Sequence, residues 1–212
     1  MSILNEISEK LQAGNRNAVK ELVQKAIDEG LSAKVILEEG LLAGMSIIGE
    51  KFKNEEIYIP EVMIAARAMN AGSELLKPLL ASAGVKATGK VVIGTVKGDL
   101  HDIGKNIVRM MMEGKGLEVH DLGVDVSAEQ FIAKANEVDA DIIAMSALLT
   151  TTMTEMKTVI DAIKAAGLRN KYKIMIGGGP VTESFCKEIG ADAYTPDAAT
   201  AAETAVKLCA GK

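Results

Sequence analysis

The sequence predicts a two-part protein of the α/β class, in which an all-α bundle of four helices precedes a domain built on a parallel sheet. Helical periodicity continues through residues 1–83, with short breaks between the periodic stretches. From residue 90 onward, short apolar runs alternate with helical stretches, which is typical of a parallel sheet covered on both faces. A chain of 212 residues that is 48% hydrophobic can bury a core in each part. We place the boundary between domains 1–88 and 89–212.

The periodic stretches of the first part predict helices over residues 3–14, 15–30, 32–53 and 60–84. Asn15 and Ser32 are suited to be N-caps, and Gly30 can end the second helix. Pro60 suits the first turn of the fourth helix, and Pro78 is expected to bend or shorten it. Small residues on that helix should allow a neighbouring helix to approach closely; they are Ala65, Ala66, Ala68, Ala71 and Gly72.

The second part alternates predicted strands with predicted helices. The strands are expected at 90–96, 118–123, 141–147, 173–179 and 191–195, and the helices at 104–115, 127–138, 152–167, 181–189 and 198–210. Five strand–helix units in about 120 residues fit a doubly wound, flavodoxin-like (Rossmann-like) domain with strand order 2-1-3-4-5.

The composition excludes several classes of function. A net charge of -5 and a pI near 5.2 argue against a nucleic-acid surface. No apolar run is long enough to span a membrane, and the polar N-terminus is unlike a signal peptide, so we expect a cytoplasmic protein. Cys186 and Cys209 lack CxxC spacing and are interpreted as reduced thiols without a catalytic or metal-binding role.

Three unusual segments follow the first, third and fourth predicted strands: GDLHDIG at 98–104, SALLTTT at 146–152 and GGGP at 177–180. These strands are neighbours in the predicted order, so the segments should meet at the carboxyl edge, where such sheets bind ligands. His101 could be a metal ligand, a base or a hydrogen-bonding group, with Asp99 or Asp102 fixing its tautomer. His120 lies within the second predicted strand and is interpreted as structural.

The remaining residues of these segments suit a bulky ligand. Gly104 permits close approach to the start of a helix, and the glycines at 177–179 would leave a gap for a long, flat group. Hydroxyl groups are offered by Ser146, Thr150, Thr151 and Thr152. Each feature alone has a plainer explanation, as a solvated histidine, a turn or a helix N-cap. Their coincidence at one edge is what indicates a site.

A phosphate or flavin site is the other interpretation of these loops. Residues 98–104 match neither GxGxxG nor GxxxxGK[ST], which disfavours a dinucleotide or a nucleoside triphosphate. A receiver-type signalling domain would need an aspartate at the end of the third strand, where this chain has Met145 and Ser146.

The spacing of the segments carries a family resemblance. Asp99-Leu100-His101-Asp102-Ile103-Gly104 reads DxHxxG, Ser146-Ala147-Leu148 reads SxL after 41 intervening residues, and Gly177-Gly178 follows after 28 more. This pattern resembles the DxHxxG…SxL…GG fingerprint of cobalamin-binding domains. With the preceding bundle, the chain resembles the corrinoid proteins of methylotrophic methyltransferase systems, which are similar to the cobalamin module of methionine synthase.

The resemblance implies a role for each of these residues. His101 would replace the cofactor's own base as the lower ligand of cobalt (base-off/His-on), and Asp99 would hydrogen-bond its far nitrogen, with Thr152 extending that relay. Ser146 and Thr150 would hydrogen-bond the buried nucleotide tail, and Gly104, Gly177 and Gly178 would make room for it. Further residues of these loops are expected to bind the cofactor: Asp102, Leu148 and Gly179. Either Gly177–Gly178 or Gly178–Gly179 could be the working glycine pair.

The helical bundle would then act as a cap over the upper face of the corrinoid. Met45, Tyr58, Pro60 and Met63 are the candidate contacts, although bundle core is the plainer interpretation of each. A hinge is expected at residues 84–90, where Gly84 and Gly89 would supply flexibility.

The resemblance implies a corrinoid methyl carrier without catalytic residues of its own. A substrate-specific methyltransferase would methylate Co(I), a second methyltransferase would pass the methyl group to a folate or thiol, and a reductive activator is a further expected partner. One alternative is the cobalamin subunit of a mutase, but the resemblance to such subunits does not include the helical bundle. Another is a cobalamin sensor, which would need a DNA-binding domain and tends to use a tryptophan that this chain lacks. A flavodoxin-like or receiver-like signalling module is the alternative without cobalamin.

Overall fold

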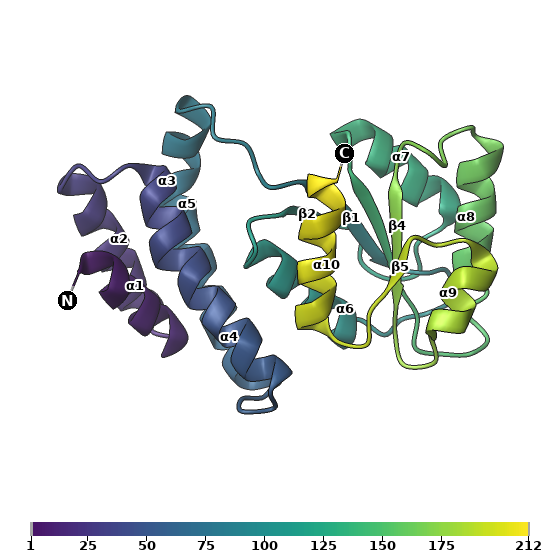
Figure 1. Cartoon of the computed structure of the whole chain (residues 1–212), viewed down its shortest axis with the longest axis horizontal. Coiled ribbons are helices and arrows are strands. Elements are labelled where there is room, and N and C mark those ends of the chain that lie inside the picture. The colour runs from purple at the N-terminus through teal and green to yellow at the C-terminus, as the bar shows by residue number, and fades with distance from the viewer. Residues whose placement is uncertain (1, 212) are drawn as a thin grey trace. The chain divides into compact units, whose positions relative to one another are not determined.

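The computed structural model describes residues 2–211 (Figure 1). The chain separates into two compact units. One comprises the residues up to Ala87 together with Gly114–Gly116, and the other comprises Thr88–Glu113 together with the residues from Leu117 onward. Each unit is described by itself.

The helical unit contains the four predicted helices, and one of them is irregular. Its elements are α1 (Ile3–Gln12), α2 (Arg16–Asp28), a continuous run of α3 (Ala33–Val35), η1 (Ile36–Leu42) and α4 (Ala43–Lys53), and α5 (Ile59–Ser82). Asn15 and Ser32 cap their helices as predicted, with side-chain oxygens that accept hydrogen bonds from the amides of Ala18 and Val35. Gly30, at φ 83°, follows the end of α2.

The segment η1 is a π-helix of seven residues, which the apolar periodicity did not predict. Glycines in and after this segment lie tightly against α1. A Cβ on Gly40 would be 3.2 Å from Ile7, and a Cβ on Gly44 would be 3.1 Å from the backbone of Ser8. Close helix packing therefore accompanies the irregular hydrogen bonding.

The fourth helix differs from expectation at Pro78, because α5 continues past it to Ser82. Pro78 and Glu74, whose carbonyl loses its intrahelical partner, are both exposed, so water can satisfy that carbonyl. The small residues of α5 do allow close packing, since a Cβ on Gly72 would lie 3.0 Å from Leu41.

The second unit is the predicted doubly wound domain, and its five strands have the predicted order β2-β1-β3-β4-β5, all parallel. The strands are β1 (Lys90–Thr95), β2 (Glu118–Asp121), β3 (Ile142–Ser146), β4 (Lys173–Gly177) and the short β5 (Ala193–Tyr194). The helices are α6 (Ile103–Glu113), α7 (Ala128–Val138), α8 (Glu155–Ala165), α9 (Glu183–Ile189) and α10 (Ala198–Ala210).

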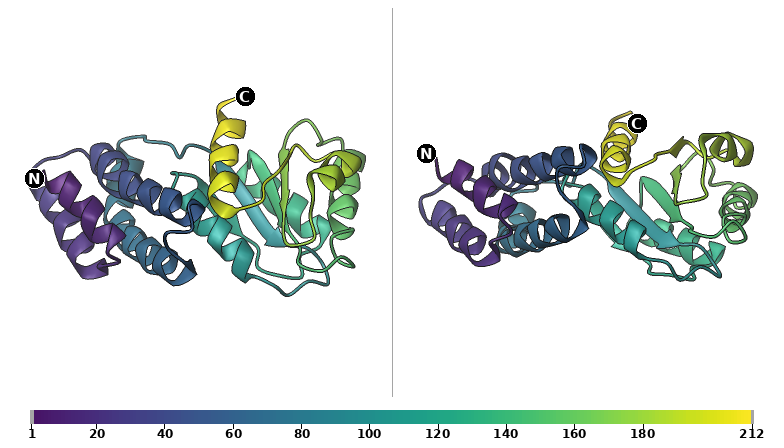
Figure 2. Two further views of the ribbon diagram at one scale, coloured as in Figure 1. Left: turned by 60° about the horizontal axis from the view of Figure 1, so that its bottom comes forward. Right: turned by 90° about the horizontal axis from the view of Figure 1, so that it is seen from below.

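Helices cover both faces of this sheet. Figures 1 and 2 show α6 and α10 on one face and α7, α8 and α9 on the other. A hydrophobic core cluster lies under α7–α9, and alternate residues of β1, β3 and β4 (Val92, Ile143 and Ile174) contribute to it. The strand register brings Thr95, Ser146 and Gly177 side by side. The three segments that follow these strands therefore begin at one edge of the sheet.

Candidate functional site

The site is built around the loop between β1 and α6. Asp99 is fully buried in this loop, whereas the side chain of His101, two residues later, is 50% exposed. Nδ1 of His101 lies 2.7 Å from Oδ1 of Asp99, and the same oxygen accepts a hydrogen bond from the His101 amide at 3.1 Å. The buried carboxylate thus orients the exposed imidazole.

The other carboxylate oxygen of Asp99 is held by the segment after β3. Oδ2 accepts hydrogen bonds from the amides of Leu148 (2.8 Å) and Leu149 (3.3 Å) and from the hydroxyl of Thr152 (2.6 Å). Five donors from two loops therefore converge on one buried side chain.

These contacts fix the charge of Asp99. Burial by itself raises the pKa of the carboxyl group, but the hydrogen bonds from Thr152, Leu148 and His101 outweigh it and hold the pKa well below its usual value. An ionised carboxylate only accepts hydrogen bonds, so Nδ1 of His101 carries the proton. The lone pair of the neutral imidazole is consequently on Nε2, which has no hydrogen-bond partner in the described residues.

Asp102, the other candidate carboxylate, lies elsewhere. It is exposed, and its Oδ2 accepts a hydrogen bond from the side-chain amide of Asn106 at 3.0 Å. Asp102 therefore interacts with the start of α6, which it directly precedes, and the hydrogen bond to the imidazole is made by Asp99 alone.

The serine and threonines after β3 have different environments. Ser146 is half-buried at the end of β3 and its hydroxyl has no protein partner in the described chain, whereas Thr150 and Thr151 are exposed. Thr152 is buried and bonded to Asp99. Ser146 and Thr150 thus keep hydroxyls that could bind a ligand, and Thr152 is already engaged.

The glycines of the site differ in what they accommodate. A Cβ on Gly104 or Gly177 would meet nothing within 4 Å. A Cβ on Gly178, at φ 131°, would lie 1.8 Å from the carbonyl oxygen of Ala147, and one on Gly179 would lie 3.0 Å from Leu148. We expected Gly178 to make room for a ligand, but the chain itself needs a glycine there, because the backbone after β3 passes too close for any side chain.

Two residues that sequence reasoning missed help to hold the loop. The hydroxyl of Thr95, at the end of β1, donates to the carbonyl oxygen of His101 at 2.9 Å. Asp125, in the loop after β2, accepts a hydrogen bond from the amide of Gly98 at 2.7 Å. Thr95 lies three residues before the start of the GDLHDIG segment, but only the fold brings Asp125 near that segment.

An ion pair between a buried lysine and a partly exposed aspartate, also missed, fixes the start of α6. Lys105 is almost fully buried, and its Nζ lies 2.6 Å from both carboxylate oxygens of Asp121 at the end of β2. Asp121 also accepts from the amide of Gly123 at 2.9 Å. This pair ties the helix that follows the DxHxxG segment to the neighbouring strand.

The residues interpreted as structural have ordinary environments. His120 lies on β2, where its Nε2 contacts Glu118 at 2.8 Å. Burial raises the pKa of the Cys186 thiol, which keeps it protonated and unreactive.

Comparisons with known proteins match both units. A B12 binding domain model matches residues 89–206, and a second model, also described as a B12 binding domain, matches residues 3–77. A corrinoid protein of Desulfitobacterium hafniense is 44% identical over 98% of both chains, and the dimethylamine corrinoid protein of Methanosarcina barkeri is 44% identical over the same shares. The chain belongs to the corrinoid proteins with B12-binding domains.

Solved structures agree with this family. The crystal structure of the methanol:cobalamin methyltransferase complex from Methanosarcina barkeri matches with a TM-score of 0.90 at 33% identity, over 99% of this chain and 80% of that one. A cobalamin-binding protein from Desulfitobacterium hafniense matches with a TM-score of 0.79 at 35% identity, over 97% of this chain and 98% of that one. The cofactor of this corrinoid protein is therefore cobalamin or a related corrinoid.

The residues around His101 fit such a group. A corrinoid has a cobalt ion that can take a nitrogen ligand and a large, mostly apolar ring. The Nε2 lone pair of His101 could serve as such a ligand atom, and there is open space beside Gly104 and Gly177. In the described sheet unit, all the exposed large hydrophobic side chains lie on the two segments that meet at His101: Leu100, Ile103, Leu148 and Leu149. Exposed apolar patches of this kind are typical of ligand-binding surfaces.

The candidate cap residues of the corrinoid protein are not equally accessible. Met45, on α4, is only 2% exposed and belongs to the buried residues, as its plainer interpretation predicted. Tyr58 is 69% exposed, Pro60 is exposed and Met63 is half-buried, all at or beside the start of α5.

The expected hinge glycines also differ from each other. Gly84 has a φ of 68° and no atom within 4 Å of a built Cβ. A Cβ on Gly89 would lie 2.3 Å from Sγ of Cys209 on α10. Close packing against α10 therefore explains why this position is a glycine, without a role in a flexible hinge.

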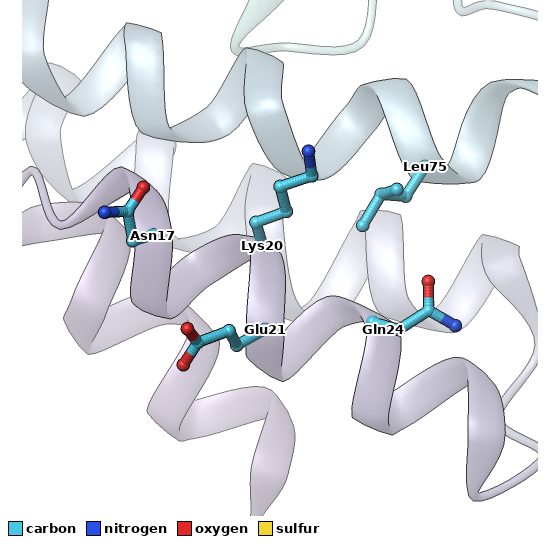
Figure 3. Close-up of a pocket in the computed structure, with 5 residues that line it drawn as sticks. All are labelled: Asn17, Lys20, Glu21, Gln24 and Leu75. Carbon is cyan, nitrogen blue, oxygen red and sulfur yellow. The ribbon is translucent and has the colours of Figure 1, made fainter.

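A groove in the helical unit, formed along α2 and α5, is unrelated to these residues. Figure 3 shows the residues that line it, which are Asn17, Lys20, Glu21 and Gln24 of α2 and Leu75 of α5. None of them is an imidazole or thiol ligand, and corrinoid binding is not assigned there.

No helix of the described chain combines the length and apolar character that crossing a bilayer requires.

Proposed function

We propose that this corrinoid protein is a methyl carrier in a methyltransferase system. The observation that carries the proposal is the 2.7 Å contact between His101 Nδ1 and buried Asp99, which leaves Nε2 of an exposed imidazole as a ligand atom among apolar side chains. When bound, the corrinoid supplies a nucleophilic cobalt that takes a methyl group from one partner and yields it to another.

The partners follow from the relatives. The structural match is to a methanol:cobalamin methyltransferase complex, and curated relatives are named dimethylamine and trimethylamine corrinoid proteins. We propose a substrate-specific methyltransferase that uses a small methylated donor, a second methyltransferase that uses a folate or thiol acceptor, and a reductive activator. Specificity for the donor would lie on the partner, because the residues described here recognise only the carrier group.

The chain's own residues would hold and tune the group. We propose base-off/His-on binding, in which His101 Nε2 ligates cobalt and the displaced nucleotide tail enters the sheet unit. Asp99 holds the proton on Nδ1, and the Thr152 hydroxyl stabilises the Asp99 charge. The hydroxyls of Ser146 and Thr150 would pair with polar atoms of the tail, since an unpaired buried polar atom is costly.

The helical unit would cover the group's other face. Several large apolar side chains of this unit are exposed, and Tyr58 is the most exposed of them at 69%. Covering a reactive cobalt with apolar side chains excludes water from it. We keep 1–88 as the cap domain and 84–90 as its hinge, with Gly84 as the flexible position. The B12-binding match over residues 3–77 supports this over the mutase alternative, which does not account for a helical unit.

The test compares the two histidines of the chain. Wild type, His101→Ala and His120→Ala are each reconstituted with hydroxocobalamin, and the reduced Co(II) forms are studied by electron paramagnetic resonance. The protein is labelled with 15N, so that coupling from a protein nitrogen is distinguished from coupling to the cofactor's own base. We expect coupling from a protein nitrogen in wild type and His120→Ala, and its loss in His101→Ala. Coupling from a protein nitrogen that persists in His101→Ala would refute the assigned ligand.

A coupled assay then tests the carrier role. Loaded protein is reduced to the Co(I) form with a chemical reductant of low potential and mixed with a methyltransferase for methanol or for a methylated amine, together with that methyl donor, and methylation is followed by the absorption change of the corrinoid. We expect methylation with one donor only. A protein that binds the corrinoid but rearranges a carbon skeleton would support the mutase alternative.

A further inference from the structure

The loop after β2 clamps the loop that carries Asp99 and His101. Asp125 makes two contacts with it. Its Oδ1 accepts a hydrogen bond from the Gly98 amide at 2.7 Å, and its own amide donates to the carbonyl oxygen of Asp99 at 3.0 Å. One residue from a different loop therefore holds the backbone of Asp99 at its carbonyl group and the backbone of the preceding residue, Gly98, at its amide group.

The backbone of Asp125 is suited to these contacts. Its φ is 55°, which lies in the left-handed region. Glycine, asparagine and aspartate adopt this region more readily than other residues do. This conformation lets the amide and the carboxylate of one residue face the same loop. A left-handed residue that is held by its neighbours often marks a functional constraint.

Asp125 is itself firmly held by β1. The amide of Val126 donates to the carbonyl oxygen of Thr95 at 3.0 Å, and the amide of Thr95 donates to that of Gly123, also at 3.0 Å. These bonds extend the pairing of the sheet past the end of β2 and fix both flanks of Asp125. The clamp is therefore part of the sheet framework.

The clamped loop needs this support because it turns sharply. Gly98 is at φ 79°, and the Asp99 amide donates to the carbonyl oxygen of Val96 at 3.1 Å, which closes a tight turn. Without Asp125, the Gly98 amide would lose its partner and the turn would loosen. The position of the Asp99 carboxylate, and with it the imidazole of His101, depends on that turn.

We propose that Asp125 is a positioning residue for His101, which preorganises the ligand loop before the corrinoid binds. The inference rests on the proposed role of His101 as the cobalt ligand. Preorganisation would strengthen the bond between His101 and cobalt, because no free energy is spent on ordering the loop at binding.

Three variants separate the contributions of Asp125. Asp125→Gly keeps the left-handed backbone and removes the acceptor, and Asp125→Asn keeps both an acceptor oxygen and tolerance of that backbone. The matched control is Asp139→Gly, since Asp139 is also left-handed at φ 53° but ends α7 with its side chain 85% exposed. Because Asp125 is an exposed residue, these variants are expected to fold, and a melting curve of each checks this.

Two readouts are measured on each protein. The first is hydrogen exchange of the Gly98 and Asp99 amides in the corrinoid-free protein. The second is measured after loading with hydroxocobalamin, and it is the pH at which added acid abolishes the absorption spectrum of the histidine-ligated form. Nitrogen coupling in the Co(II) form is recorded as a check.

We expect Asp125→Gly to speed exchange of the Gly98 amide about tenfold, and to weaken histidine ligation about three- to tenfold, the range for one lost hydrogen bond. Weaker ligation raises the acid midpoint by about 0.5–1 pH unit, because protons then displace the histidine more easily. Asp125→Asn and Asp139→Gly should match wild type. Unchanged exchange and midpoint in Asp125→Gly would overturn the inference. Corrinoid bound to wild type without nitrogen coupling would overturn the role of His101 and the inference together, even where the exchange result holds.

Discussion

The replacement of Asp99 by asparagine tests the centre of the site. The amide has the shape of the carboxylate but only one acceptor oxygen, and its other terminal atom is an NH2 donor. The carboxylate accepts three hydrogen bonds at Oδ2, from Leu148, Leu149 and Thr152, and two at Oδ1, both from His101. The amide oxygen is therefore expected to replace Oδ2, and the NH2 group to face His101.

This arrangement sets the size of the effect. Two charge-assisted hydrogen bonds to His101 are lost, each worth about 1.5–3 kcal/mol, and the amide recovers part by donating to Nδ1. We expect Asp99→Asn to lower the free energy of unfolding by about 2–4 kcal/mol. An imidazole that accepts at Nδ1 carries its proton on Nε2, so it no longer presents a lone pair to cobalt.

Urea unfolding of the corrinoid-free protein at neutral pH measures the stability, and nitrogen coupling in the loaded Co(II) protein measures ligation. Asp102→Asn is the matched control, since Asp102 is an exposed carboxylate of the same segment that bonds only to Asn106. It should change stability by less than about 0.5 kcal/mol. An Asp99→Asn protein with wild-type stability and wild-type nitrogen coupling would refute the reasoning.

The same variant predicts a change in acid stability. Hydrogen bonds hold the folded pKa of Asp99 below 3.8, its value without the fold. A group with a lowered folded pKa adds stability that is complete above its unfolded pKa and disappears as the pH falls below it. Wild type should therefore lose stability more steeply than Asp99→Asn as the pH falls below about 4, measured by urea unfolding across that range. Parallel curves for the two proteins would show that Asp99 is not held ionised by the fold.

Three further predictions concern residues around this centre, each measured by urea unfolding. Gly178→Ala should lower the free energy of unfolding by about 3 kcal/mol or more, because its Cβ would lie 1.8 Å from a backbone oxygen. Gly177→Ala should change the free energy of unfolding of the corrinoid-free protein by less than about 1 kcal/mol, but it should reduce the retention of corrinoid. Lys105→Met should cost about 1 kcal/mol, because partly exposed Asp121 loses its 2.6 Å partner but keeps water, the Gly123 amide and Arg109, and an unaltered transition would contradict a stabilising pair. Ser127→Ala removes the N-cap of α7, away from His101, and should cost about 1 kcal/mol with nitrogen coupling retained.

Local chemistry explains why much of the fold could be predicted from the sequence. Helix starts at Asn15 and Ser32 follow from side chains that can accept amide hydrogen bonds, and parallel strands follow from short apolar runs between helical stretches. Strand order follows from the doubly wound class, and it places the ends of β1, β3 and β4 together.

Features that depend on contacts between distant segments could not be predicted in the same way. The π-helical segment η1 and the continuation of α5 past Pro78 depend on packing and exposure that periodicity does not report. The glycines at 177–179 look alike in sequence, yet only Gly178 meets the backbone of Ala147.

By itself, the sequence determined the class of fold, the edge of the sheet at which His101 lies and the family to which the chain belongs. The local sequence left Asp99 and Asp102 open as partners of the imidazole and the family resemblance favoured Asp99; the tertiary structure gives the physical reason, because Asp99 is the carboxylate that is buried under the loop after β3. It also brought Asp125 to Gly98 across 27 positions of sequence, a contact that exists only because β2 pairs beside β1. Spacing along a chain can indicate which residues are special, but three-dimensional pairing determines which of them touch.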